Sequence, residues 1–445
     1  MKKVYRRVLL FTSVVVFLLA APLVVLYGIG YRAQSLAVDP LPVGVVLVDA
    51  EPVRADVYVN DEYRSRVPES IPNLPEGPVI IRVAAEGYEP WEKTVVVEPG
   101  MAIEVRDIRL FPSDPVRNTL LADVERFSLA PNRQLIAAVT STNRLHIIDQ
   151  SGTAVAPATR LPRAATSLLW SPNSDQLLIR YGASTYTVAT VGRTISLAAV
   201  NQLAGATDVV WDPRIPGRIL YRDTANRLAA FNITGNGSTR LAADVVSFAT
   251  TSRAIFVLTE AGILNELTLQ GALVTEDVAT PTGTVKQLFV TPAGDLAWWM
   301  SDGSVWARGE GGELELVADK ALTIRWSPDG RQLLVQPDQH SLRVYNVSDE
   351  RATQAIGTSQ LITRLSRAIT DPQWFAGGRH LLYQVDDEVI ITETDTRDRP
   401  RTWQVDTTNV GLTAATVGEG GDTILYRKNT ADGPVLMQTE LVLDE

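Results

Sequence analysis

The 445-residue chain contains no cysteine, only three histidines and only four methionines. The absence of cysteine excludes disulfide frameworks, thiolate metal sites and cysteine nucleophiles. The three histidines, His146, His340 and His380, fall in different parts of the chain, and none has a second histidine or a carboxylate at the spacing of metal ligands. The sequence therefore predicts no metal site.

Catalytic and phosphate-binding signatures are also missing. The chain has no Gly-x-x-x-x-Gly-Lys-Ser/Thr loop and no Gly-x-Ser-x-Gly turn. The acidic clusters at residues 386–388 and 395–398 lack the spaced carboxylates and central glycine of a calcium loop. We expect no cofactor and no catalytic residue, with one reservation: isolated acids that meet only in the folded chain escape motif analysis.

Positive charge is in deficit. The formal net charge is −10, and because Lys2, Lys3, Arg6 and Arg7 lie in the N-terminal tail, the chain after residue 7 carries −14. A strongly negative body repels phosphate, and no basic stripe interleaved with aromatic residues reverses this locally. Nucleic acid is therefore excluded as the expected partner.

One long hydrophobic run is present, from Val8 to Ile29, with 22 residues and no charge. As a helix it reaches roughly 33 Å, enough for a hydrocarbon core of about 30 Å. Four cations precede the run and only Arg32 follows closely, so the positive-inside rule predicts a signal anchor at residues 1–30. The expected localisation is the cytoplasmic membrane, single-pass, with the N-terminus inside and the bulk of the chain extracytoplasmic. A cleaved signal peptide is the alternative, disfavoured by Pro22.

After a connector at residues 31–41, the hydrophobic pattern changes to a period of two. Residues 44–48, 57–59, 79–83 and 94–97 are rich in β-branched residues and are separated by Gly, Pro, Asn and Asp. The sequence predicts a small all-β sandwich over residues 42–111.

Three segments of this sandwich resemble the PEGA domain of bacterial surface proteins. They are the Val-Tyr-Val-Asn strand at residues 57–60, the Leu-Pro-Glu-Gly turn at 74–77 and the Gly-Tyr-Glu-Pro step at 87–90, in the family's order. One departure is Val53-Arg54, where the family usually carries glycine. The resemblance implies a spacer module rather than an enzyme.

Residues 112–445 repeat one phrase, clearest as Trp326-Ser327-Pro328-Asp329-Gly330. In each copy an apolar run, a turn and a second apolar run indicate two antiparallel strands. The copies recur about every 40 residues: Pro172 follows Pro131 by 41 residues, and Pro213 follows Pro172 by 41 residues. Pro292 follows Pro213 by 79 residues, and this interval contains one degenerate copy. The recurring positions are Trp170, Pro172, Trp211, Pro213, Pro292, Trp326, Pro328, Asp329, Gly330 and Trp374.

A period of this length with several strands predicts a β-propeller of about eight blades, with seven as the alternative. The phrase is similar to the WD-repeat-like copies of TolB-type propellers. Residues 119–121 precede the first copy and are placed to add the outer strand of the last blade. We expect the recurring tryptophans to pack between sheets, whereas the four that lie off this phase are candidate binding aromatics: Trp298, Trp299, Trp306 and Trp403.

The sequence thus predicts an all-β, membrane-anchored protein that is not an enzyme. Its propeller would serve as a protein- or glycan-binding platform in the bacterial cell envelope, spaced from the membrane by the PEGA-like domain. Two alternatives stay open: a propeller hydrolase or lyase acting on envelope polysaccharide or peptide, and a structural subunit of an envelope or secretion assembly. The ligand, the partner and the oligomeric state are not specified by the sequence.

Overall fold

The computed structural model describes residues 3–28, 31–32, 41–52, 54–278, 280–308, 312–350, 353–407, 414–417 and 421–443. The chain divides into two compact units. Unit 1 comprises Met1–Pro115, Arg397–Arg401 and Val442–Glu445, and unit 2 comprises Val116–Thr396 and Thr402–Leu441.

The N-terminal helix of unit 1, α1 (Lys3–Gly28), has 26 residues and contains Pro22. In the part of the chain that the structure describes, no helix has both the length and the apolar character needed to cross a membrane. The predicted span ended at Ile29, which lies outside the described residues. The finding contradicts the predicted single-pass anchor, so the predicted membrane localisation is wrong.

The rest of unit 1 is built from two four-stranded sheets. In the first, β2 (Leu41–Glu51) pairs with β1 (Tyr31–Arg32), β5 (Glu69–Pro75) and β8 (Ala102–Arg109), and in the second the order is β4 (Glu62–Arg66), β3 (Asp56–Val59), β6 (Gly77–Ala84) and β7 (Trp91–Val97). Buried and exposed residues alternate along β6 and β7, because successive side chains of a strand point to opposite faces. Val57, Ile81 and Trp91 are nearly inaccessible and form part of the core.

Two segments distant in sequence complete unit 1. The backbone N–H of Thr94, in β7, donates to the Asp398 carboxylate at 3.1 Å. The hydroxyl of Tyr88 accepts a hydrogen bond from the backbone N–H of Leu443 at 2.9 Å. Because β6 is the one described strand that pairs with β7 in its sheet, the contact with Asp398 satisfies a donor that an unpaired edge would leave open to another chain.

The described residues of unit 2 form eight four-stranded antiparallel sheets. The first four sheets are β10 (Val124–Leu129), β11 (Leu135–Thr140), β12 (Arg144–Asp149), β13 (Ala154–Arg160); β14 (Ser167–Trp170), β15 (Gln176–Tyr181), β16 (Thr185–Val191), β17 (Ile195–Ala199); β18 (Thr207–Trp211), β19 (Arg218–Arg222), β20 (Leu228–Asn232), β21 (Gly237–Ala242); and β22 (Val245–Thr250), β23 (Ala254–Thr259), β24 (Leu264–Thr268), β25 (Leu273–Val278).

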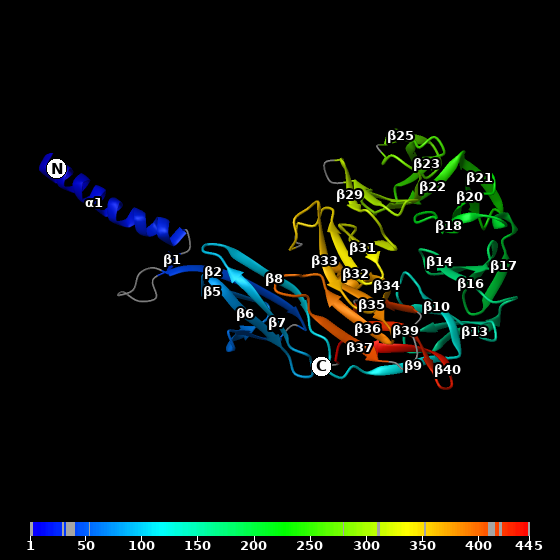
Figure 1. Ribbon diagram of the computed structural model, residues 1–445, viewed down its shortest axis with the longest axis horizontal. Helices are drawn as coiled ribbons and strands as arrows, with labels where there is room; N and C mark the ends of the chain where they lie inside the picture. The colour runs from blue at the N-terminus through cyan, green and yellow to red at the C-terminus, as the bar shows by residue number, and fades with distance from the viewer. Residues whose placement is uncertain are drawn as a thin grey trace. The chain divides into compact units, whose positions relative to one another are not determined.

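The next four sheets repeat this arrangement: β26 (Val285–Val290), β27 (Leu296–Met300), β28 (Val305–Arg308), β29 (Leu314–Ala318); β30 (Thr323–Trp326), β31 (Gln332–Asp338), β32 (Ser341–Asn346), β33 (Thr358–Arg364); β34 (Ile369–Trp374), β35 (His380–Val385), β36 (Glu388–Glu393), β37 (Thr402–Thr407); and β38 (Ala414–Val417), β39 (Thr423–Thr430), β40 (Gly433–Glu440), β9 (Arg117–Ala122). Two short 3-10 turns, η1 (Asn201–Leu203) and η2 (Ala376–Gly378), lie between strands. Unit 2 is therefore propeller-like, as the repeat predicted (Figure 1).

The last sheet takes its fourth strand from the beginning of unit 2. Strand β9 pairs antiparallel with β40, with Leu121 opposite Leu436 and Arg117 opposite Thr439. The predicted pairing of residues 119–121 with the last repeat is confirmed.

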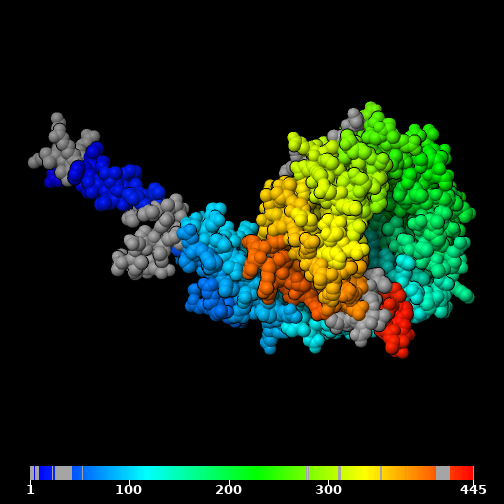
Figure 2. All heavy atoms as spheres, in the orientation of Figure 1, coloured from blue at the N-terminus to red at the C-terminus, as the bar shows by residue number. Residues whose placement is uncertain are grey.

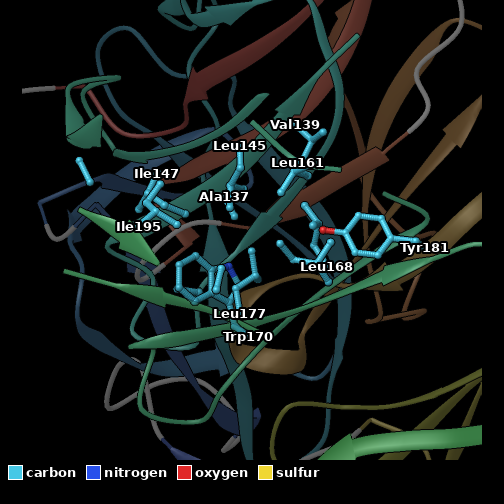
Figure 3. Close-up of a cluster of buried hydrophobic side chains, with 14 residues drawn as sticks. Ala137, Val139, Leu145, Ile147, Leu161, Leu168, Trp170, Leu177, Tyr181 and Ile195 are labelled. Carbon is cyan, nitrogen blue, oxygen red and sulfur yellow. The ribbon is translucent and has the colours of Figure 1, made fainter. Parts of the chain in front are cut away.

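The core of unit 2 lies between neighbouring sheets rather than within any one of them. One cluster joins the first and second sheets and includes Ala137, Ile147, Trp170 and Leu177, which Figure 3 shows gathered between strands. Another contains Val124, Ile136, Ala138 and Ile148 of the first sheet with Leu425 and Leu436 of the last. The first and last sheets therefore share a core in the same way as sheets that follow one another in sequence.

Candidate binding surface

Three of the recurring tryptophans tie consecutive sheets together through their indole N–H groups. Trp170 donates to the backbone carbonyl of Ser128 at 3.0 Å, and Trp211 donates to that of Leu169 at 2.9 Å. Trp374 repeats the contact with the carbonyl of Arg325 at 2.9 Å. In each case the acceptor lies in the first strand of the preceding sheet, so the ring fills the space between sheets and also satisfies a backbone acceptor.

Trp326 belongs to the sharpest copy of the repeat, yet its indole nitrogen is buried without a hydrogen-bond partner. This difference gives a matched comparison. We expect Trp170→Phe to lower the free energy of unfolding by about 1 kcal/mol more than Trp326→Phe, because only the first substitution removes a hydrogen bond. Denaturant unfolding followed by far-ultraviolet circular dichroism measures the difference, and equal losses would show that the indole bond contributes nothing.

The turn after Trp326 explains the Ser-Pro-Asp-Gly phrase. The Ser327 hydroxyl donates to the Asp329 carboxylate at 2.6 Å, and that carboxylate also accepts the backbone N–H of Arg331 at 3.1 Å. Gly330 has a φ of +74°, and a Cβ there would lie 2.8 Å from the Cβ of Thr291 in the preceding sheet. The phrase is therefore a close-packed turn, not a ligand loop.

The four off-phase tryptophans do not form one surface. Trp298 and Trp403 are buried, with 0% and 4% of their surface exposed, so neither offers a ring face to a ligand. Trp299 is half-buried, and the ammonium of Lys286 lies 3.6 Å from the centroid of its ring. Trp306 is half-buried and packs beside the core of the fourth and fifth sheets. The sequence could not distinguish these positions from exposed ones, because two adjacent tryptophans on a strand face opposite sides.

Buried acidic side chains form a second set of ties between elements. The carboxylate of Asp212 pairs with Arg218, which donates to the Leu269 carbonyl of the next sheet at 2.6 Å. Asp349 pairs with Arg379 at 2.5 Å across the sixth and seventh sheets. Both carboxylates are almost completely buried, and removing either partner would leave an uncompensated charge.

The largest of these ties lies between the last two sheets. Asp406 of β37 accepts the Tyr426 hydroxyl at 2.6 Å and the Lys428 ammonium at 3.2 Å, both from β39. Arg117 of β9 approaches the same carboxylate at 3.6 Å. Burial, together with the neighbouring Asp406 charge, raises the pKa of the Tyr426 phenol, which stays a proton donor. This network was invisible to motif analysis because its members come from three distant strands.

The sequence left open that isolated acids meet in the folded chain to form a reaction centre, and carboxylates on the first strands of the sheets are the candidates for this. In Figure 1 the labelled first strands β10, β14, β18 and β22 lie nearer the middle of unit 2 than the outer strands. Glu125 pairs with Arg427 at 3.7 Å, and Asp208 pairs with Arg222 at 2.8 Å. Asp371 pairs with Arg325 at 3.3 Å. Each acid is thus next to its own arginine, and none of these three carboxylates is paired with another carboxylate.

One hollow of about 520 Å³ lies between the fourth and fifth sheets. Its wall includes Phe256, Glu266 and Val278 from the fourth sheet and Leu296 and Arg308 from the fifth. A carboxylate and a guanidinium on opposite walls suit a polar ligand that carries both charges. Thr275 supplies the one hydroxyl among the residues that line it, and no histidine is among them to act as its base.

Unit 1 also has an exposed aromatic group on its second sheet. Tyr58 and Tyr63 meet edge to face with ring centroids 5.8 Å apart, and the guanidinium of Arg82 lies 3.9 Å above the Tyr58 ring. The residue types are those enriched at interfaces, but Arg82 already covers the Tyr58 face.

Comparison with known proteins agrees with both units. Residues 43–110 match the PEGA domain, so the chain carries a PEGA domain there. The C-terminal WD40 domain of Sif2 is similar in structure, with a TM-score of 0.51 and 12% identity, covering 74% of this chain and 99% of that domain. The β-propeller domain of Cps50 (Swd1) from Myceliophteria thermophila has a TM-score of 0.44 and 13% sequence identity, and the match covers 74% of this chain and 100% of that domain. This TM-score is too low to support an inference. No curated protein matches the sequence. At such low identity the likeness establishes a WD40-like propeller fold alone.

Proposed function

We propose that this protein is a non-catalytic binding and scaffolding protein, in which unit 2 presents the binding surface and the PEGA domain acts as a positioning module. In this proposal the eight sheets of unit 2 are the blades of one closed ring of the TolB-like type. The partner is a protein or a glycan and not nucleic acid, since the chain carries a net charge of −10.

One observation carries the proposal: three buried aspartates of unit 2 are neutralised by ion pairs. Asp212, Asp349 and Asp406 each pair with a basic side chain, and two of these three pairs join different sheets. A general acid or base needs a perturbed proton affinity and access to substrate, whereas these groups have neither free oxygen atoms nor exposure. The arrangement supports a rigid ring that displays its loops.

A hydrolase or lyase is the second candidate, because Glu125, Asp208 and Asp371 are exposed on first strands. The test compares capture with turnover. Full-length protein is used as bait with chemical crosslinking in a lysate of its own cells, and in parallel it is incubated with polysaccharide and peptide substrates. The proposal predicts a captured partner crosslinked to unit 2 and no turnover. Turnover that Asp208→Asn or Asp371→Asn abolishes would overturn it.

A further inference from the structure

Positive charge is concentrated between Glu125 and Asp208, a stretch that contains all of the first two sheets of unit 2 except the first two residues of β10. Residues 126–207 contain seven arginines, no lysine and two acids, Asp149 and Asp175, for a net charge of +5. The remainder of the chain therefore carries −15. These sheets form the cyan-to-green surface at the right of Figure 2.

Five of the seven arginines lie at one end of the two sheets. We call them the arginine cluster: Arg126, Arg144, Arg160, Arg163 and Arg180. Both acids, together with Arg133 and Arg193, lie in or beside the turns at the opposite end, which join β10 to β11, β12 to β13, β14 to β15 and β16 to β17. All five side chains of the cluster are exposed.

The loop of residues 161–166 holds the arginine cluster together. Its carbonyl at Ala165 accepts the Arg126 Nε–H at 3.2 Å, and its N–H at Thr166 donates to the backbone carbonyl of Arg180 at 2.7 Å. Arg163 lies in this loop, with its guanidinium 5.9 Å from the ring centroid of Tyr181.

Arg144 and Arg160 are direct cross-strand partners in the pairing of β12 with β13. Like charges directly opposite on neighbouring strands are destabilising, so the pair lowers stability unless an anion compensates it. The positive field reaches His146, whose pKa is lowered first by burial and then by the charge of Arg144. Within the described ranges none of the five guanidinium groups forms an ion pair.

Acids adjacent to the arginine cluster are engaged elsewhere. Asp123 accepts the Ser141 hydroxyl at 2.7 Å, Glu125 pairs with Arg427, and Asp208 pairs with Arg222. Arg126 and Arg180 each donate to a backbone carbonyl, of Ala165 and Ala183 respectively. Within the described ranges no hydrogen bond or ion pair engages the guanidinium groups of Arg144 and Arg160, which therefore offer their donors to an acceptor outside the chain. Arginine forks match carboxylate and phosphate oxygens in a bidentate geometry that lysine lacks.

We propose that the arginine cluster is the docking site for a short acidic peptide segment of a partner protein, an inference that rests on the binding role proposed above. A short segment is favoured over a long polyanion or an anionic bilayer because the remaining −15 of the chain repels any negative surface that extends beyond the cluster. Carboxylates spaced along an extended peptide reach several guanidinium groups at once, which adds orientation to charge.

The test is fluorescence anisotropy with full-length protein and a labelled octapeptide in which glutamate alternates with serine. The matched peptide carries glutamine in place of glutamate. We expect binding of the glutamate peptide only, weakened by added salt, and at least about tenfold weaker for R144E/R160E, since charge-assisted hydrogen bonds are lost and repulsion replaces them. R133E/R193E makes the same charge change at the other end of the sheets and should stay within about twofold.

Several outcomes contradict the proposal. Unchanged peptide affinity in folded R144E/R160E would do so, as would tighter binding of inorganic polyphosphate or of phosphatidylglycerol vesicles than of the peptide. If circular dichroism shows that R144E/R160E is unfolded, R163Q on the exposed loop replaces it and must weaken binding by about threefold. If R144E/R160E still retains the partner captured by unit 2, the docking site is wrong while the proposed binding function stands.

Discussion

A fragment that begins at Asp114 should resist denaturant far better than one that begins at Asp123. The two fragments lack the N-terminal part of unit 1 equally and differ by little more than β9, so the comparison isolates this strand. Its loss removes a full ladder with β40 and the packing of Leu120 and Leu121 against the core shared by the first and last sheets. We expect a difference of roughly 3–5 kcal/mol in the free energy of unfolding. Equal midpoints in guanidinium would show that β9 does not close unit 2.

The second large effect is expected for Asp406→Ala. Substitution removes the carboxylate that accepts the Tyr426 hydroxyl, which keeps its contact with the Thr439 hydroxyl. It also leaves the Lys428 ammonium without its counter-charge in a site where the carboxylate is only 6% exposed. Removing one partner of such a buried pair costs about 3–5 kcal/mol. Unfolding of the full chain by urea, followed at unit 2, measures the loss.

Glu125→Ala is the matched control for Asp406→Ala. Glu125 also pairs with an arginine of β39, Arg427, but at 3.7 Å and with half of its side chain exposed. Exposed ion pairs contribute about 0–1 kcal/mol, so the control should be nearly as stable as the parent chain. Similar losses for both variants would indicate that the Asp406 network is not the tie between the last two sheets.

The propeller-like repeat and the alternating strands of the PEGA domain were predictable because both depend on local order along the chain. The role of β9 was also predictable, since residues 119–121 read as a strand with no repeat of their own. The membrane anchor was the main error. It rested on the length of one uncharged run, and no described helix meets the requirements of a span.

The hydrogen bonds that join neighbouring sheets could not be predicted from the sequence, for a physical reason. Trp170 and Trp211 bond to backbone carbonyls, which every residue possesses and which leave no mark in the sequence. Trp326, in the clearest copy, makes no such bond. Conversely, Trp298 was considered a binding candidate because it lies off the repeat phase, yet it is completely buried on the second strand of its sheet.

The arginine cluster had a sequence signal that motif analysis did not use. A charge count over residues 126–207 separates a positive segment from a negative chain. The count cannot show which arginines meet, because Arg144 and Arg160 become neighbours only through the register of β12 with β13. Charge composition therefore indicates the sign of the charge that the proposed partner carries, and strand register indicates where that partner binds.

Hydrogen exchange of the full-length protein, with and without its captured partner, tests the binding account most directly. The account predicts slower exchange at residues 141–144, 160–166 and 180–184, the backbone that carries most of the arginine cluster, and little change at residues 43–110. Slower exchange confined to residues 43–110, with those three segments unchanged, would contradict it.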